Sequence, residues 1–166
     1  MATVLITVSD LSIAEDTFKV DFKATGAELE LGHATAAYFV GYYLHSLVNT
    51  PDFTKGVAEY GRELIDAMTE KGNPAAPFEP ATVVLTLEDA DVNTGRFDAN
   101  ITFHGGDPKG EHLPSIAQIV GTYMRSLISS AEFQLACWKF ADAFVSEYDG
   151  RHIANLEFAP DEIRAA

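Results

Sequence analysis

The amino-acid sequence predicts an α+β fold in which a ββαα unit occurs twice in tandem. The two units are expected to form a two-layer pseudo-dimer, with antiparallel strands packed under four helices. Three observations lead to this prediction. The apolar segment 34–49, ATAAYFVGYYLHSLVN, returns as segment 114–129, PSIAQIVGTYMRSLIS. Two strand-like stretches precede each copy, and an amphipathic helical stretch follows each copy.

The two apolar segments match without a gap. Residues 80 positions apart (117 − 37) are identical at Ala37 and Ala117, Val40 and Val120, Gly41 and Gly121, Tyr43 and Tyr123, Ser46 and Ser126, and Leu47 and Leu127. Apolar residues lie on every side of the first predicted helix, and a helix that is apolar all round is expected to be buried all round. One face can pack on its own unit, and the repeat supplies a second unit for the other face.

The two apolar helices are therefore expected to meet at or near a pseudo-twofold axis. Gly41, Tyr43, Gly121 and Tyr123 form the predicted interface. Glycine lets two helices approach closely, at a cost in helix propensity of about 1 kcal/mol at each position. If the helices do not meet, the spare apolar face is a surface for another chain and the protein is an oligomer.

A strand pair begins each predicted unit. Segments 3–9 and 82–88 are rich in β-branched residues and lie 79 positions apart (82 − 3). Segments 18–23 and 97–104 alternate apolar with polar residues, which predicts one buried and one wet face. Loops rich in Asp, Ser and Asn separate the strands and predict two hairpins.

Two helices follow each strand pair. Thr35 and Ser115 stand where N-caps of the first helices are expected. A second helix is predicted after Thr50-Pro51 and after Ser130, each with an apolar stripe that is typical of packing rather than of ligand binding.

The predicted units are residues 1–80, including a proline-rich linker at 72–80, and residues 81–166. A chain of 166 residues suits one domain or two small ones, and the two units are expected to share one core. The terminal segment 161–166 is expected to fray.

Composition indicates a folded cytosolic protein. Hydrophobic residues make up 47% of the chain, and the single cysteine, Cys137, is expected to be a buried apolar residue. One cysteine allows no internal disulfide, which fits a reducing compartment. The N-terminus lacks the basic region of a signal peptide, and no apolar run reaches the roughly 18 residues of a membrane span.

The formal net charge of −14 is divided equally between the halves. Residues 1–79 carry 12 acids and 5 bases, and residues 80–166 carry 13 acids and 6 bases. This surface repels nucleic acids and anionic membranes, so neither is an expected partner. Acidic proteins can imitate nucleic acid when carboxylates follow one surface. The acids are interpreted here as solvated faces that aid solubility.

The sequence contains no motif for catalysis, for metal ligation or for a cofactor. His33 and His112 precede the first helix of each unit, and with Thr35 and Ser115 they predict two related sites for an anionic group at helix N-termini. In the second copy, Arg125 occupies the position that corresponds to His45, and its side chain carries a positive charge. The other interpretation is that the two histidines cap or pack in loops.

One resemblance rests on short segments of both units. ITVSD, FKVDF and HATAAYFV, with VVLTLED, RFDANITF and LPSIAQIV in the second copy, resemble small uncharacterised bacteriophage proteins made of single ββα units. The likeness covers roughly half of each unit. The duplication, the second helix and the acidity depart from it. The resemblance implies a phage accessory protein and carries over no catalytic residue.

We therefore expect a non-enzymatic, acidic interaction protein that binds and blocks a host protein, as a phage anti-defence factor would. A small-ligand protein that sequesters an anionic metabolite or nucleotide is the first alternative. A structural or assembly protein is the second. The chain is expected to be a monomer with pseudo-twofold symmetry or a homo-oligomer.

Overall fold

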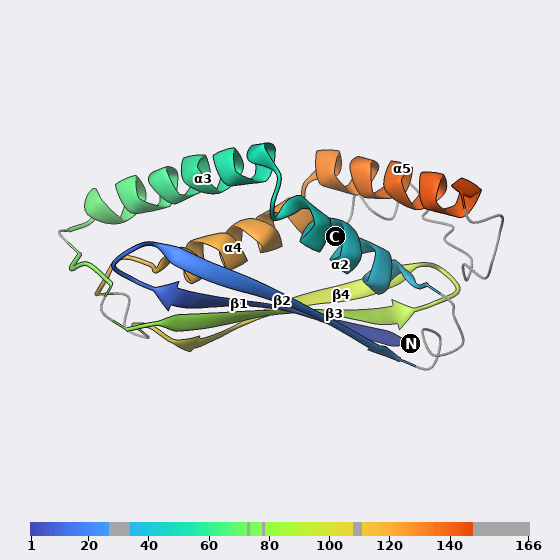
Figure 1. The fold of residues 1–166 in the computed structure, drawn as a ribbon, viewed down its shortest axis with the longest axis horizontal. Helices are drawn as coiled ribbons and strands as arrows, with labels where there is room; N and C mark the ends of the chain where they lie inside the picture. The colour runs from blue at the N-terminus through green and yellow to red at the C-terminus, as the bar shows by residue number, and fades with distance from the viewer. Residues whose placement is uncertain (27–33, 73, 78, 108–110, 148–166) are drawn as a thin grey trace.

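The computed structural model describes residues 1–26, 34–72, 74–77, 79–107 and 111–147, with side chains up to Ala143. His33 and the terminal segment 161–166, both named above, lie outside these residues. The described chain is an α+β protein with one four-stranded antiparallel sheet and four helices, all on one face of the sheet (Figure 1). Within these ranges no helix is long and apolar enough to cross a membrane.

The sheet consists of β1 (Ala2–Ser12), β2 (Thr17–Gly26), β3 (Ala81–Asp91) and β4 (Arg96–Gly105), in the order β2-β1-β3-β4. Both predicted hairpins are confirmed. The two hairpins join through antiparallel pairing of the central strands β1 and β3. The alternation of apolar and polar residues directs one side of every strand toward the helices.

The inner helices are α2 (Ala36–Leu47) and α4 (Ile116–Ile128), which pack directly on β1 and β3. The predicted N-caps are confirmed, because the side chains of Thr35 and Ser115 accept hydrogen bonds from the amides of Tyr38 and Gln118. Burial on every side is wrong for α2. Tyr42 is 41% exposed, because the sheet and one outer helix cover only part of the circumference.

Gly41 and Gly121 lie against the sheet. A Cβ atom at Gly41 would be 2.5 Å from Val4 Cγ1 and 3.3 Å from Leu87 Cδ1. A Cβ atom at Gly121 would collide with Val83. The expectation that these glycines bring the two helices together is therefore wrong. They allow each helix to approach the central strands closely instead.

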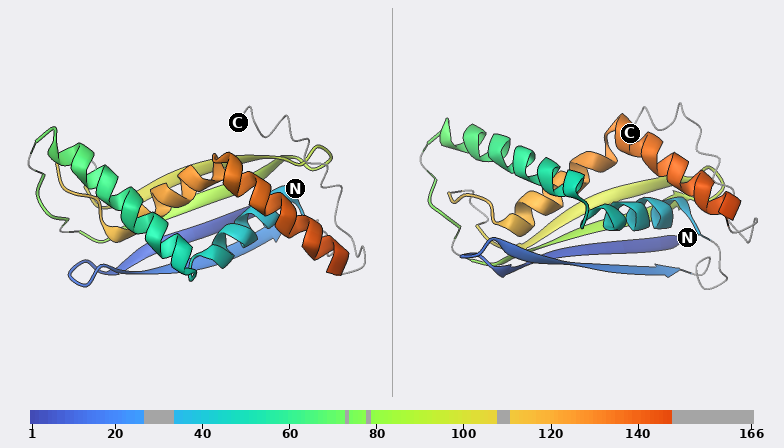
Figure 2. Two further views of the ribbon diagram at one scale, coloured as in Figure 1. Left: turned by 90° about the horizontal axis from the view of Figure 1, so that it is seen from above. Right: turned by 45° about the horizontal axis from the view of Figure 1, so that its top comes forward.

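The outer helices are α3 (Pro51–Thr69) and α5 (Ala131–Glu147), which stand outside the inner pair (Figure 2). The expected single layer of helices is thus wrong, and the helices form two tiers. The outer helices cross between the halves of the chain: α3 packs on α4, and α5 packs on α2.

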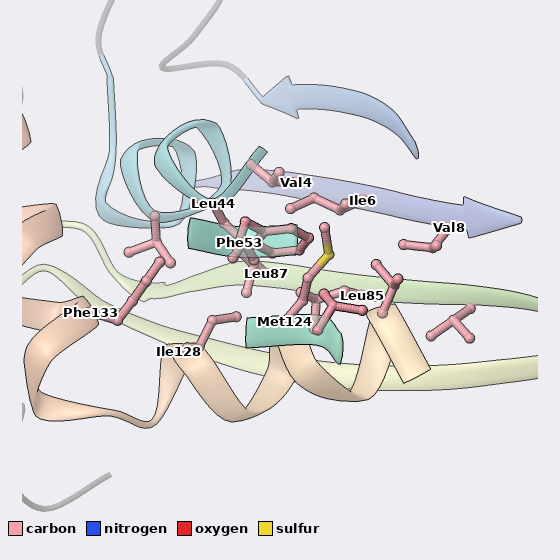
Figure 3. Packing of buried hydrophobic residues seen from close by; sticks show 14 of the residues in the cluster. Val4, Ile6, Val8, Leu44, Phe53, Leu85, Leu87, Met124, Ile128 and Phe133 are labelled. Atoms are coloured by element: carbon pink, nitrogen blue, oxygen red, sulfur yellow. The ribbon is translucent and has the colours of Figure 1, made fainter. Parts of the chain in front are cut away.

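One hydrophobic core fills the space between the sheet and the helices (Figure 3). It draws on both halves of the chain. The largest side chains that Figure 3 labels come from β1, β3, α2, α4 and both outer helices: Ile6, Leu85, Leu87, Leu44, Met124, Ile128, Phe53 and Phe133.

Candidate functional site

The entrance of α2 is closed by a carboxylate from the other half of the chain. Asp89, at the end of β3, is only 5% exposed. Its Oδ1 accepts a hydrogen bond from the amide of Ala37 at 3.0 Å, and its Oδ2 accepts one from the amide of Ala2 at 2.7 Å. A carboxylate at a helix N-terminus is stabilised by the first-turn amides and the helix dipole. Asp89 therefore joins the start of α2 to the start of β1.

The entrance of α4 has the same arrangement. Oδ1 of Asp10 accepts a hydrogen bond from the amide of Ala117, and its Oδ2 accepts one from the amide of Ala81, both at 2.8 Å. Ser115 and Gln118 add a capping box at this end. Strand alternation accounts for both carboxylates, because Asp10 and Asp89 continue the helix-facing rows of β1 and β3.

Groups of the chain itself already occupy the two helix N-termini where anion sites were predicted. Thr35 and Ser115 are each 1% exposed, and their side chains cap their own helices. The first-turn amides of Ala37 and Ala117 already bind a carboxylate of the chain. An external anion at either helix N-terminus would have to displace that carboxylate.

His112 is held by its own loop. Its Nδ1 lies 2.9 Å from Oδ2 of Asp107, which also accepts a hydrogen bond from the His112 amide at 2.9 Å. The pair borders a shallow hollow lined by Pro77, Glu79, Gly106, Asp107, His112, Leu113 and Gln118. The carboxylates of Glu79 and Asp107 in this lining would repel an anionic ligand. His33, its predicted counterpart, lies outside the described residues.

Arg125 does not join the other predicted ligand residues. It lies in the last turn of α4, and its Nη1 donates a hydrogen bond to Ser129 Oγ at 2.8 Å. Ser115 caps the opposite end of the helix, ten residues away, or about 15 Å at 1.5 Å per residue. The corresponding His45 of α2 packs against the ring of Phe22 at 5.3 Å.

Tyr43 and Tyr123 contact the outer helices of opposite halves. The ring of Tyr43 lies 5.1 Å from that of Phe140 on α5. The ring of Tyr123 lies 5.6 Å from that of Tyr60 on α3. Burial raises the pKa of both phenols above the ordinary value for tyrosine. The two tyrosines thus belong to contacts between the halves, while Gly41 and Gly121 belong to contacts with the sheet.

The exposed face of α3 carries a row of carboxylates. Asp52, Glu59, Glu63, Asp66 and Glu70 are all exposed. Their intervals of seven, four, three and four residues place them on one side of the helix, over about 27 Å of its length. The spacing was readable in the sequence, but only the structure puts this side in solvent. We call these five residues the acidic row.

The exposed face of α5 is apolar at two large side chains. Leu135 is 55% exposed and Trp138 is 37% exposed. The positions 80 residues earlier, on α3, hold Lys55 and Ala58. We call Leu135 and Trp138 the apolar pair. The acidic row and the apolar pair both belong to the outer tier of helices (Figures 1 and 2).

The other side chains that could bind a metal ion or act as a nucleophile offer no such site among the described residues. Among the described residues, no cluster of three or more His, Cys, Asp or Glu side chains is arranged to hold a metal ion. Cys137 is buried, and burial raises the pKa of its thiol to about 12. A thiol with that pKa is protonated at neutral pH and is a poor nucleophile.

Comparisons with protein-family models, with curated proteins and with solved structures yield no match to this chain.

Proposed function

We propose that this protein is a non-enzymatic interaction protein that binds and blocks a basic protein of its host, as a phage accessory factor would. The observation that carries the proposal is the exposed apolar pair on α5. Large apolar side chains that stay exposed on an outer helix are typical of protein contact sites, and tryptophan is enriched among residues that dominate binding energy. Leu135 and Trp138 would anchor the partner.

The acidic row on α3 indicates which kind of partner surface would fit. Five exposed carboxylates on one helix side favour a protein surface rich in lysine and arginine, and they accelerate encounter with it. The row is less complete on α5, where Glu132 matches Asp52 but Lys139 and Ala143 stand in place of Glu59 and Glu63.

We propose further that the chain is a tandem ββαα duplicate whose units, residues 1–80 and 81–166, form a pseudo-dimer. Three relationships support this. Asp10 and Asp89 make equivalent bonds to opposite halves, Gly41 and Gly121 make equivalent contacts with the sheet, and α3 and α5 cross to opposite inner helices. In this pseudo-dimer the two outer helices differ in their exposed residues, with the acidic row on α3 and the apolar pair on α5.

Binding is tested with tagged full-length protein in a lysate of candidate host cells. The variant Leu135→Ser with Trp138→Ser removes the apolar pair, and Lys55→Ser with Ala58→Ser makes the matched change on α3. We expect wild type and the α3 control to retain one basic protein in near-stoichiometric amount. The α5 variant should retain at least about tenfold less while remaining folded at the assay temperature, as its melting curve would show.

Two results would contradict the proposal. Equal capture by wild type and by the α5 variant would overturn the proposed surface. Robust turnover of a substrate by the purified protein, with no stable partner, would overturn the non-enzymatic function. Retention should also weaken between low and high salt, because the acidic row contributes through screened charges.

The anionic-ligand alternative has a direct test. Thermal melts with nucleotides and inorganic phosphate should show no shift, since the chain's own carboxylates hold the helix-entrance amides. A ligand at 100 times its Kd would add about 2.7 kcal/mol to the free energy of unfolding.

A further inference from the structure

The two outer edges of the sheet differ in how they are protected. β2 and β4 are the edge strands, and each has one side without a strand neighbour in the described chain (Figure 2). Exposed edges invite pairing with another strand, and natural proteins discourage this with charged side chains, above all lysine. β2 carries exposed Lys19 and Lys23. β4 carries no lysine and no proline, and its charged residues, Arg96 and Asp98, lie in its first three positions.

An exposed apolar side chain also marks β4. Phe103 is 46% exposed. It continues the row of Phe97, Ala99 and Ile101, which pack against the core from the helix-facing side of the strand. Asp98, Asn100, Thr102 and His104 are exposed and alternate with this row. Among the residues that the structure describes, this edge therefore combines backbone without a strand neighbour with a half-exposed aromatic ring.

We propose that β4 pairs antiparallel with β4 of a second copy of this chain, about a twofold axis at Ile101, so that the two sheets become one. This inference is independent of the proposed function. A twofold axis perpendicular to the sheet keeps both sets of helices on the same face. That geometry requires helix-facing residues to pair with helix-facing residues, because a shift of one residue reverses every side chain.

The sequence of β4 is complementary to itself in this register. Asp98 stands opposite His104 of the second copy, which brings a carboxylate next to an imidazole. Phe103 stands opposite Ala99, so the large exposed ring meets the smallest side chain of the row. Asn100 stands opposite Thr102, and Ile101 faces itself. Both the Asp98–His104 contact and the Phe103 contact occur twice because of the symmetry.

The neighbouring registers with the same orientation lose this match. Moving the axis to Asn100 places Asp98 opposite Thr102 and Phe97 opposite Phe103. Moving it to Thr102 places His104 opposite Asn100 and removes Asp98 from the strand pairing. Cross-strand pairs contribute about 0.2 to 1 kcal/mol each, and the neighbouring registers offer pairs of their own, Phe97 with Phe103 or Ile101 with Phe103. Only the register centred on Ile101 places the carboxylate of Asp98 opposite the imidazole of His104, and we assign the register on that pair.

Sedimentation velocity of the full chain at physiological salt, over a wide concentration range, tests the association. We expect wild type to form a dimer. Asp98→Lys removes the carboxylate opposite His104 at both places and sets a lysine there instead, and it should raise the dissociation constant by about tenfold. Adding His104→Glu to Asp98→Lys gives that lysine a carboxylate partner and should recover most of the affinity. Lys23→Glu, the matched charge reversal on β2, should leave it unchanged.

Disulfide cross-linking tests the register. Asn100→Cys combined with Thr102→Cys should give a covalent dimer under mild oxidation, because these positions face each other across the axis within disulfide reach. Lys19→Cys combined with Asp21→Cys on β2 is the control and should stay monomeric. A wild type that remains a monomer throughout, a dimer insensitive to Asp98→Lys, or cross-linking through β2 would each overturn the proposal.

Discussion

Asp10 and Asp89 each accept backbone hydrogen bonds from the opposite half of the chain. Asp10 binds the amides at the start of β3 and α4, and Asp89 binds those at the start of β1 and α2. Each carboxylate thus binds the first residues of one strand and of one helix, both of which are remote from it in sequence. The two residues act as paired clamps between the halves.

Removing one clamp should destabilise the whole protein. Asp89→Ala leaves the buried amides of Ala2 and Ala37 without their acceptor, and charge-assisted bonds of this kind contribute about 1.5 to 3 kcal/mol. We expect the free energy of unfolding to fall by about 3 kcal/mol in a urea melt. Glu63→Gln, on the exposed side of α3, should change it by less than about 0.5 kcal/mol. Similar values for both variants would contradict the clamp.

A methyl group at Gly41 should also be costly. Although alanine favours a helix over glycine by about 1 kcal/mol, the new Cβ would lie 2.5 Å from Val4 Cγ1. We expect Gly41→Ala to destabilise the protein by about 1 to 3 kcal/mol, and Val4→Ala in the same chain to recover part of that loss. Gly72→Ala is the control, because a Cβ there meets nothing within 4 Å. A stabilised Gly41→Ala variant would show that α2 can lift from the sheet.

Cys137 should be protected from thiol reagents while the protein is folded. Burial raises its pKa to about 12, above the value of about 8.5 in an unfolded chain. The unfolded state therefore loses its thiol proton first as the pH rises. The stabilising contribution is complete below the unfolded pKa and is lost between that pH and about 12. A thiol-reactive chromophore at pH 8 should label urea-unfolded protein rapidly and native protein very slowly. Equal labelling rates would place the thiol in solvent.

The aromatic contact between Tyr43 and Phe140 should couple the two halves energetically. A double-mutant cycle with Tyr43→Leu and Phe140→Leu should give an interaction energy of about 0.5 to 1.5 kcal/mol. The same cycle with Tyr43→Leu and Tyr60→Leu should give about zero, because Tyr60 packs on Tyr123 and not on Tyr43. Equal coupling in both cycles would mean that the substitutions act through general unfolding.

Local patterns in the sequence predicted the elements well. Thr35 and Ser115 cap the inner helices because short hydroxyl side chains reach the first-turn amides. The alternation around Phe18 and Phe97 identified the two hairpins because a strand has a period of two. These signals depend only on neighbouring residues.

Features that depend on long-range packing were not predictable in the same way. Gly41 was expected between helices, but a glycine pattern does not say whether a helix or a strand approaches it. Asp10 and Asp89 are equivalent acids near the ends of β1 and β3. Their role depends on amides about 50 to 110 positions away in the chain.

The central pairing of β1 with β3 has a consequence for how the protein folds. Its register joins residues as distant as Thr3 and Glu88, whereas each hairpin closes within a few residues of its turn. Hairpins form in about 1 to 10 μs, and bringing the central strands together requires closing a much longer loop at an entropic cost. We expect this closure to limit the folding rate. Substitutions at Ile6 or Leu85 should then slow refolding.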